Sequence, residues 1–366
     1  MNICLVAGAR PNFMKIAPII NALRARDHRD WFLVHTGQHY DARLSDVFFH
    51  ELGLPQPDVW LGVGSGSHAE QTAKVMVGIE RVFLERKPDL VLVVGDVNST
   101  LAASLVASKL GIRLAHVEAG LRSGDRAMPE EINRMVTDIL ADVLFTTSMD
   151  AHDHLAREGV SPEKIHFVGN VMVDSLLAHL PAARQRDTLQ GLGLVTPDGT
   201  PAKYAVLTLH RPSNVDQPEV FGGLMRAVDH VAQQMPVIFP VHPRTALRVK
   251  EHADSTSDIR TVEPMGYLDF LALTSSASLI LTDSGGLQEE ATILGVPCLT
   301  LRENTERPVT ITHGTNVLVG TSPETIIAAA DRAMSSPNVA AGVPDLWDGH
   351  AAVRIVDLLL AGAGRP

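Results

Sequence analysis

The chain has 366 residues, a length that at roughly 150 residues per domain predicts about two globular domains. Hydrophobic residues make up 45% of the chain and charged residues 20%, a balance that is typical of packed globular proteins and excludes disorder for most of the chain. The 31 Lys and Arg residues stand against 42 Asp and Glu residues, and the resulting net charge of -11 excludes an overall basic surface for nucleic acid.

The first residues and the cysteines indicate the compartment. The strand-like segment at 2–7 follows the initial Met directly, without a basic leader, and no apolar run reaches the roughly 18 to 20 residues that a membrane helix needs. The two cysteines, Cys4 and Cys298, lie far apart in apolar segments and predict neither a disulfide framework nor a thiolate zinc site. We therefore expect a cytoplasmic protein without a membrane span.

In the first half of the chain, short apolar segments alternate with longer helical patterns, which predicts parallel βα units. The predicted strands are residues 3–7, 32–35, 90–94, 114–117, 143–146 and 165–168. The predicted helices include residues 14–26, 69–85, 100–110 and 131–140. The first half is therefore expected to form an α/β domain with a parallel sheet.

A segment rich in Pro, Gly and Arg at 180–203 predicts a domain junction, after which the alternation starts again. The predicted strands of the second half are residues 204–209, 237–240, 259–262, 279–282 and 297–301. We expect two Rossmann-like, doubly wound domains, 1–175 and 176–350, that face a central cleft, and a last helix within 351–366 that returns to the first domain. In such sheets a ligand binds at the carboxyl ends of the strands.

The turn after the first strand excludes the usual nucleotide motifs. It reads Gly8-Ala9-Arg10-Pro11, where a dinucleotide fold would carry G-x-G-x-x-G, and the glycine-rich segment at 62–67 follows no predicted strand. No G-x-x-x-x-G-K-[ST] loop for ATP and no H-E-x-x-H metal motif is present. His152 and His154 point in different directions on a helix and are expected to be solvated, so the sequence predicts neither NAD nor a metal.

Carboxylates gather after the third and fourth predicted strands. Asp96 follows strand 90–94, Glu118 follows strand 114–117, and Glu130 opens the next helix behind a proline. Asp96 alone is compatible with a helix N-cap, and Glu130 alone is compatible with helix initiation. Three acids beside Arg122 and Arg134 at one sheet edge instead indicate proton transfer next to a charged leaving group.

The second half carries a candidate anion site. Ser284-Gly285-Gly286 connects a strand to a helix, whose free N–H groups and positive dipole end attract a phosphate that the glycines allow to approach closely. Glu290, further along this helix, could accept hydrogen bonds from ribose hydroxyls. A plain turn and helix cap is the alternative. The polar residues that follow the first two predicted strands of this half are His210, Arg211 and His242.

Taken together, these motifs resemble the non-hydrolysing bacterial UDP-N-acetylglucosamine 2-epimerases, in order from residue 3 to about residue 320. The segments that carry the resemblance are Gly8-Ala9-Arg10-Pro11 with Lys15, Gly95-Asp96, His116-Val117-Glu118-Ala119-Gly120-Leu121-Arg122, Pro129-Glu130-Glu131 with Asn133-Arg134, His210-Arg211, Pro240-Val241-His242-Pro243, Asp283-Ser284-Gly285-Gly286-Leu287-Gln288-Glu289-Glu290 and Thr305-Glu306-Arg307-Pro308. The resemblance implies a fold like that of the glycosyltransferase B class, a UDP-sugar substrate, no cofactor or metal, and a homodimer.

The resemblance further implies a reaction that interconverts UDP-N-acetylglucosamine (UDP-GlcNAc) and UDP-N-acetylmannosamine (UDP-ManNAc), the latter feeding surface polysaccharides. The reaction is an anti elimination of UDP, giving 2-acetamidoglucal, followed by re-addition. The implied catalytic residues are Asp96, Glu118, Glu130 and His210. The implied UDP-sugar ligands are Arg10, Lys15, Arg134, Arg211, His242, Phe270, Ser284, Gly285, Gly286, Glu290 and Arg307, with Glu290 at the ribose and Phe270 near the uracil.

Other functions stay open. Phe13 departs from the usual Pro-Glu-Ala-Ile-Lys pattern, and relatives that act on UDP-2,3-diacetamido uronic acids share the Gly-Ala-Arg-Pro start and an aromatic residue nearby. A glycosyltransferase of the same fold would need an acceptor site, and a UDP-sugar sensor would not need three acids. Gln38-His39-Tyr40-Asp41 and Lys74 depart from the pattern of an activating UDP-GlcNAc site, which predicts kinetics without such activation.

Overall fold

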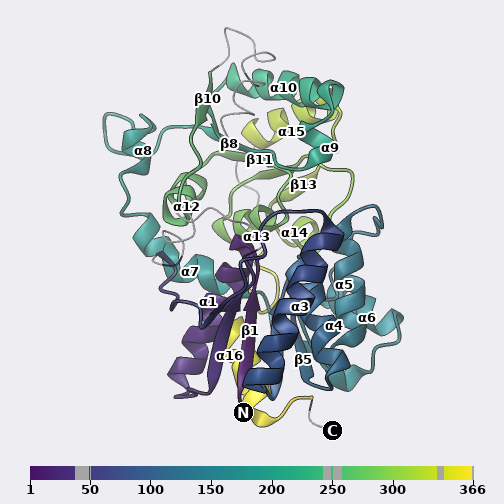
Figure 1. Ribbon diagram of the computed structural model, residues 1–366. Coiled ribbons are helices and arrows are strands. Elements are labelled where there is room, and N and C mark those ends of the chain that lie inside the picture. Colours follow the sequence, from purple (N-terminus) through teal and green to yellow (C-terminus); the bar gives the residue numbers. More distant parts are fainter. Residues whose placement is uncertain (38–48, 50, 242–248, 250–257, 336–341, 365–366) are drawn as a thin grey trace. The chain divides into compact units, whose positions relative to one another are not determined.

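The computed structural model describes residues 1–37, 49, 51–241, 249, 258–335 and 342–364. The chain divides into two compact units (Figure 1). Unit 1 consists of Met1–Ala178 together with Asp345–Pro366, and unit 2 consists of His179–Pro344. Among the described residues, no helix is both long enough and apolar enough to cross a lipid bilayer.

Unit 1 is built on a seven-stranded parallel sheet in the order β3-β2-β1-β4-β5-β6-β7. The strands are β1 Ile3–Ala7, β2 Trp31–His35, β3 Val59–Trp60, β4 Leu90–Val94, β5 Arg113–Ala119, β6 Val143–Thr146 and β7 Ile165–Phe167. The α-helices are α1 Arg10–Ala25, α3 His68–Arg86, α4 Asn98–Lys109, α5 Pro129–Leu140, α6 Met149–Arg157, α7 Val171–Ala183, which continues into unit 2, and α16 Ala351–Ala361. All five residues of β1 and of β4 are buried, as expected for strands covered by helices on both faces.

Unit 2 repeats this architecture with six parallel strands in the order β10-β9-β8-β11-β12-β13. The strands are β8 Ala205–Thr208, β9 Val237–Pro240, β10 Ile259–Val262, β11 Leu279–Thr282, β12 Cys298–Thr300 and β13 Asn316–Leu318. The α-helices are α8 Thr188–Gly191, α9 Pro212–Val215, α10 Pro218–Ala232, α12 Tyr267–Ser275, α13 Gly285–Leu294, α14 Val309–Thr312 and α15 Pro323–Ser335. The predicted α/β class with two doubly wound, Rossmann-like sheets is confirmed.

The C-terminal segment completes unit 1. Helix α16 packs against α1, and Arg26 forms hydrogen bonds of 2.7 and 2.8 Å with the Asp357 carboxylate. The Asp174 carboxylate accepts hydrogen bonds from the first two N–H groups of α16, those of Ala351 and Ala352, at 3.1 and 2.8 Å. Burial raises the pKa of Asp174 to about 6 although these N–H groups oppose the shift.

Most differences from the predicted elements are at their ends. Helix α1 begins at Arg10, four residues before the predicted start. The Asn12 side chain accepts hydrogen bonds from the N–H groups of Gly8 and Ala9, and Pro11 is tolerated because it lies in the first turn. Strand β5 continues two residues beyond the predicted end, and thus contains Glu118. The short strands β3 and β13 were not predicted, since two or three residues show no periodicity.

Candidate active site

Glu118 lies near the carboxyl end of β5 in an unusual backbone conformation. Its φ angle is 73°, in the left-handed region, and the pairing of β5 with β6 shifts register between Val117 and Ala119. Holding a residue with a side chain in this region costs on the order of 1–3 kcal/mol, and such strain is concentrated at functional sites. The backbone therefore supports Glu118 as a functional residue independently of its carboxylate.

Lys15, from α1, is the counter-ion of Glu118. Its Nζ forms an ion pair with Glu118 Oε2, and the two side chains are only 8% and 4% exposed. Gly95, which follows β4, makes room for this pair, because a Cβ at Gly95 would lie 2.9 Å from Lys15 Nζ and 3.3 Å from Glu118 Oε2. The structure thus brings two predicted site residues, Lys15 and Glu118, into contact.

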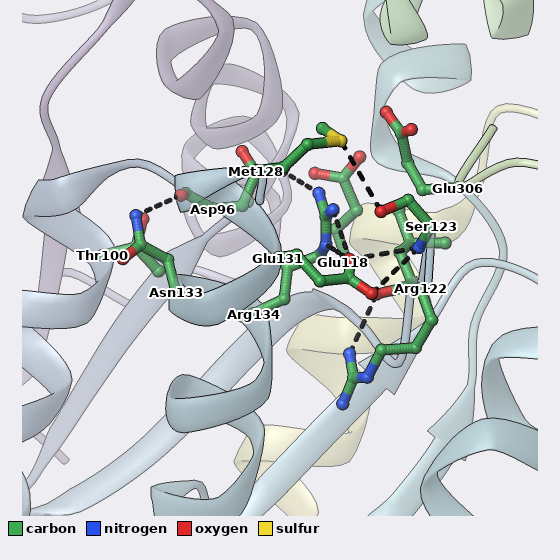
Figure 2. Close-up of polar contacts among 12 residues, drawn as sticks. Asp96, Thr100, Glu118, Arg122, Ser123, Met128, Glu131, Asn133, Arg134 and Glu306 are labelled. Carbon is green, nitrogen blue, oxygen red and sulfur yellow. Dashed lines mark hydrogen bonds and ion pairs between the residues drawn. The ribbon is translucent and has the colours of Figure 1, made fainter. Parts of the chain in front are cut away.

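Asp96 contacts α5 and does not cap α4. Helix α4 begins at Asn98 with Val97 in the N-cap position, whereas the Asp96 carboxylate forms an ion pair with Arg134 (Figure 2). Asn133 binds the backbone of Asp96, since Asn133 Nδ2 donates a hydrogen bond to the Asp96 carbonyl oxygen at 2.8 Å. The alternative of a simple helix cap is therefore wrong, and Asp96 and Arg134 belong to one polar cluster.

Glu131 connects Arg134 to the loop that follows β5. Its carboxylate accepts hydrogen bonds from Arg134 NH2 at 2.6 Å and from the Ser123 N–H at 3.1 Å (Figure 2). It also accepts the Gly124 N–H at 2.9 Å. Burial on its own would raise the pKa of Glu131, but these hydrogen bonds outweigh burial and lower it. Glu131 is therefore a structural carboxylate in this cluster.

Glu130 and Arg10 are more accessible. Glu130 lies in the first turn of α5, is partly exposed, and makes no ion pair with a residue in the part of the chain that the structure describes. Arg10 is the first residue of α1 and is also partly exposed. Both side chains start from helix N-termini at the carboxyl edge of the sheet, where ligands bind in such folds.

One buried residue of this region, Asp138, was not predicted from the sequence. Asp138 in α5 accepts hydrogen bonds from His116 Nδ1 at 2.6 Å, from the Gly120 N–H at 3.1 Å and from Arg122 NH1 at 2.8 Å. A signal was present, because Glu131, Arg134 and Asp138 have the spacing of one helix face and that face is buried. Charged residues on a buried helix face indicate a polar network.

In unit 2, Asp283 organises the loop after β8. It is fully buried at the end of β11 and accepts hydrogen bonds from His210 Nδ1 at 2.6 Å, the Arg211 N–H at 3.0 Å and Asn214 Nδ2 at 3.1 Å. Burial on its own would raise the pKa of Asp283, but the hydrogen bonds from His210 and the backbone outweigh it, and the pKa is lowered. The His210 side chain remains 62% exposed, so its ring is oriented and still accessible.

The start of α13 is packed against a charged pair. The Ser284 N–H donates to Thr282 Oγ1 at 2.9 Å, and the Ser284 side chain makes no capping hydrogen bond. A Cβ at Gly285 would lie 2.5 Å from Arg307 NH1 and 2.7 Å from Glu306 Oε1, so a side chain there would displace this ion pair. The structure therefore places Ser284, Gly285 and Arg307 together, and Gly286 follows in the first turn of the helix.

Glu290, one and a half turns into α13, is buried beside Tyr267. Burial and the negative charge of Glu289 raise the pKa of Glu290 to about 8, while the Tyr267 hydroxyl, 3.4 Å from Glu290 Oε1, opposes the shift. Glu289 itself pairs with Arg307 at 2.7 Å. Phe270 lies one turn after Tyr267 on α12 and packs at the border of the core of unit 2.

Some predicted residues are not located by the structure. His242 and the segment Gln38-His39-Tyr40-Asp41 lie outside the described residues. Lys74 is exposed on α3.

Within the described ranges, no group of three or more His, Cys, Asp or Glu side chains is arranged to hold a metal ion.

Comparison with known proteins gives a consistent result. The family model described as UDP-N-acetylglucosamine 2-epimerase matches residues 21–360. The chain is 46% identical over 340 residues to a UDP-N-acetylglucosamine 2-epimerase of Methanocaldococcus jannaschii, covering 90% of this chain and 92% of that protein. It is 42% identical over 333 residues to a UDP-2,3-diacetamido-2,3-dideoxy-D-glucuronate 2-epimerase of Pseudomonas aeruginosa, covering 90% and 91%.

A solved structure shares the whole fold. The crystal structure of the Methanocaldococcus jannaschii UDP-GlcNAc 2-epimerase in complex with UDP-GlcNAc and UDP superposes with a TM-score of 0.89 and 44% sequence identity. The match covers 99% of this chain and 100% of that one.

Proposed function

Because the chain belongs to the UDP-N-acetylglucosamine 2-epimerase family, we propose that it is a non-hydrolysing isomerase that interconverts UDP-GlcNAc and UDP-ManNAc. The reaction would begin with anti elimination of UDP, in which the C2 proton and the C1–O bond are lost and 2-acetamidoglucal forms. UDP then adds back to C1 while a proton returns to the other face of C2. The reaction needs acids and bases near C2, and cations near the departing pyrophosphate.

The observation that carries this proposal is the pair of carboxylates that follow the neighbouring strands β4 and β5. Asp96 and Glu118 are each held by a cation from a helix, Arg134 and Lys15 respectively. The strained backbone at Glu118 is the kind of feature that a purely structural carboxylate does not require. We assign the proton transfers to Asp96, Glu118 and Glu130.

Unit 2 carries the groups that suit UDP. The N–H groups of Gly285 and Gly286 lie in the first turn of α13, where the helix dipole attracts an anion, and Ser284 is the N-cap residue beside them. Asp283 orients the neighbouring loop through His210 Nδ1 and the Arg211 N–H, and we assign the exposed side of the His210 ring and the Arg211 guanidinium to the pyrophosphate. Preorganised donors of this kind can lower a barrier by about 3 kcal/mol each. The remaining proposed UDP ligands of unit 2 are Arg307, Glu290 for the ribose and Phe270 for the uracil, and unit 1 contributes Arg10.

The test of this proposal is NMR of UDP-GlcNAc incubated with the protein in deuterated water. We expect UDP-ManNAc to form with deuterium at C2 and none at C3 or C4. Prolonged incubation should also release small amounts of UDP and 2-acetamidoglucal. Epimerisation with retention of the C2 proton, or a requirement for added NAD, would contradict the elimination mechanism.

A UDP-2,3-diacetamido uronic acid is the second candidate substrate, since a relative with that name is 42% identical to this chain. The aromatic residue that suggested it, Phe13, is 3% exposed, and its ring packs against His35 and Phe49 with centroids 4.8 and 4.7 Å away. Phe13 is thus committed to the packing of unit 1, which favours UDP-GlcNAc. Turnover of the two UDP-sugars at equal concentration decides between them. A UDP-sugar transferase would instead form no product until an acceptor is added.

We further propose that the enzyme acts as a homodimer. On α3, Val77 and Leu84 are 54% and 58% exposed, and on α5, Ile132 and Ile139 are 36% and 70% exposed. Each pair is seven residues apart and therefore lies on one face of its helix. Exposed apolar faces of this kind mark association surfaces. Light scattering should give twice the 39.4 kDa chain mass, and Leu84→Glu with Ile139→Glu should give the chain mass.

We also propose a cytoplasmic location, where UDP-sugars are used and thiols stay reduced. Cys4 and Cys298 are both free and buried, which suits a reducing compartment. Cell fractionation of a tagged chain tests this, and recovery of the active enzyme outside the cytoplasmic fraction would contradict it.

A further inference from the structure

Asp138 binds the chain on both sides of Glu118, one of the three proposed acid-base carboxylates. Its Oδ1 is 2.6 Å from Nδ1 of His116, two residues before Glu118. Its Oδ2 accepts the N–H of Gly120, two residues after Glu118, at 3.1 Å. One carboxylate therefore closes a clamp across the bulge that holds Glu118 in the left-handed region.

The clamp also reaches the loop of Asp96. Nε2 of His116 lies 2.9 Å from the carbonyl oxygen of Gly95, the residue before Asp96. A carbonyl oxygen only accepts, so Nε2 must carry a proton, and the short contact at Nδ1 requires a second proton between the ring and Asp138. Burial would raise the pKa of Asp138, but His116 and Arg122 outweigh burial and lower it. The hydrogen bond between His116 Nδ1 and the Asp138 carboxylate is therefore charge-assisted.

We infer that Asp138 is a positioning residue for the reaction: through His116 and the Gly120 N–H it fixes the backbone that aims Asp96 and Glu118. This inference rests on the proposed function, because Asp96 and Glu118 are the groups that would exchange protons with the sugar. Neither hydrogen bond of the clamp touches these carboxylates directly. Loss of the clamp should therefore impair turnover more than it impairs UDP-sugar binding.

The surrounding residues explain why a carboxylate is needed at position 138. Three donors converge on it: the His116 ring, the Gly120 N–H and Arg122 NH1, which is 2.8 Å away. Arg122 is in turn held by Glu158 at 2.7 Å. Gly120 cannot be replaced by a residue with a side chain, since its φ is 78° and a Cβ there would lie 2.3 Å from the Ala151 carbonyl oxygen. The bulge is thus fixed between α5 and α6.

The test compares Asp138→Ala with Asp138→Asn. The Asn oxygen can keep the contacts to Gly120 and Arg122, while its NH2 group donates to His116 Nδ1 and leaves Nε2–H on the Gly95 carbonyl. We expect Asp138→Ala to lower kcat on the order of 10- to 100-fold, the effect of misplacing a reacting group by about 1 Å, with KM within about threefold. Asp138→Asn should restore most of kcat.

Thr137→Val is the matched control, because Thr137 is buried in the same turn and its hydroxyl has no hydrogen-bond partner among the described residues. It should turn over like the wild type. A wild-type kcat in Asp138→Ala, or an equal loss in Asp138→Asn, would overturn the inference. Should Asp138→Ala not fold, His116→Gln opens the same clamp and keeps a donor for Gly95, and a wild-type kcat in that variant would overturn it as well.

A second measurement separates this inference from the proposed function. Amide hydrogen exchange at Gly120 should be slow in the wild type and in Asp138→Asn, and faster in Asp138→Ala. If the wild type does not epimerise UDP-GlcNAc, the proposed function is wrong while the exchange data still report the clamp. Unchanged Gly120 exchange in Asp138→Ala would overturn the clamp even in an active enzyme.

Discussion

Lys15→Met removes the cation of a buried ion pair and should destabilise unit 1. The Lys15 and Glu118 side chains are 8% and 4% exposed, and loss of one partner of such a pair costs about 3–5 kcal/mol because the other charge stays buried. Met retains the length of the aliphatic stem, so little packing is lost. We expect about 3 kcal/mol, the lower end of that range, because Glu118 retains other interactions.

Urea unfolding followed by tryptophan fluorescence measures this loss for unit 1 alone. All three tryptophans of the chain, Trp31, Trp60 and Trp347, belong to unit 1. With an m-value of about 1–3 kcal/mol per M, a loss of 3 kcal/mol lowers the midpoint by about 1 M or more. Arg29→Met, which breaks an exposed pair with Asp27, serves as the control and should leave the midpoint unchanged.

The double variant Lys15→Met with Glu118→Gln completes the cycle. Removing both charges leaves neither one buried without its partner. The free energy of unfolding lost in the double variant should therefore be smaller, by about 1 kcal/mol or more, than the sum of the losses in the two single variants. Additivity within about 0.5 kcal/mol, or a midpoint for Lys15→Met equal to that of the control, would refute the argument that the two charges compensate each other.

The remaining predictions concern the chemistry and the ligand. Asp96→Asn, Glu118→Gln and Glu130→Gln should each lower turnover by about 100- to 10,000-fold in a coupled assay, with UDP affinity by calorimetry within about tenfold of wild type. UDP at 100 times its Kd should stabilise the protein by about 2.7 kcal/mol with a chelator present, and the absence of a melting shift would contradict a metal-free site. The pKa of Glu290 is about 8 in the folded protein, which is above its value in the unfolded chain. The folded state therefore binds the proton more tightly, and the free energy of unfolding should fall as pH rises from 5 to 8. Glu290→Gln should therefore gain stability over the wild type across that range in calorimetry, while it binds UDP less tightly. Initial rates should depend hyperbolically on UDP-GlcNAc, and a lag with UDP-ManNAc that traces of UDP-GlcNAc abolish would contradict this.

The sequence predicted the repeating part of the fold because buried parallel strands leave a strong local pattern. Strands β1, β4 and β6 match the predicted ranges to the residue. The pattern is lost where the chain departs from regular geometry. The extension of β5 through Glu118 depends on a bulge, and a bulge is formed by contacts with β6 and with α5 that lie far along the chain.

The candidate site was predictable where a residue type is unusual for its place, and not where it depends on tertiary contacts. Asp96 and Glu118 stood out because carboxylates follow apolar strands. Asp138 is one acid in a regular helix, and only folding shows that it faces three donors. Phe13 illustrates the opposite error: an aromatic residue near the expected sugar position packs against His35 and Phe49.

The return of the C-terminal segment to unit 1 has a consequence for biosynthesis. Asp345–Pro366 belongs to unit 1, although the whole of unit 2 separates it from Ala178 in the chain. At about 5–20 residues per second, a ribosome completes this segment roughly 10–40 s after it has made residue 178. During that interval Asp174 lacks the hydrogen bonds that the N–H groups of α16 later donate to it. The face of α1 that packs on α16 is also still exposed. Unit 1 should thus be the unit that chaperones bind on the nascent chain.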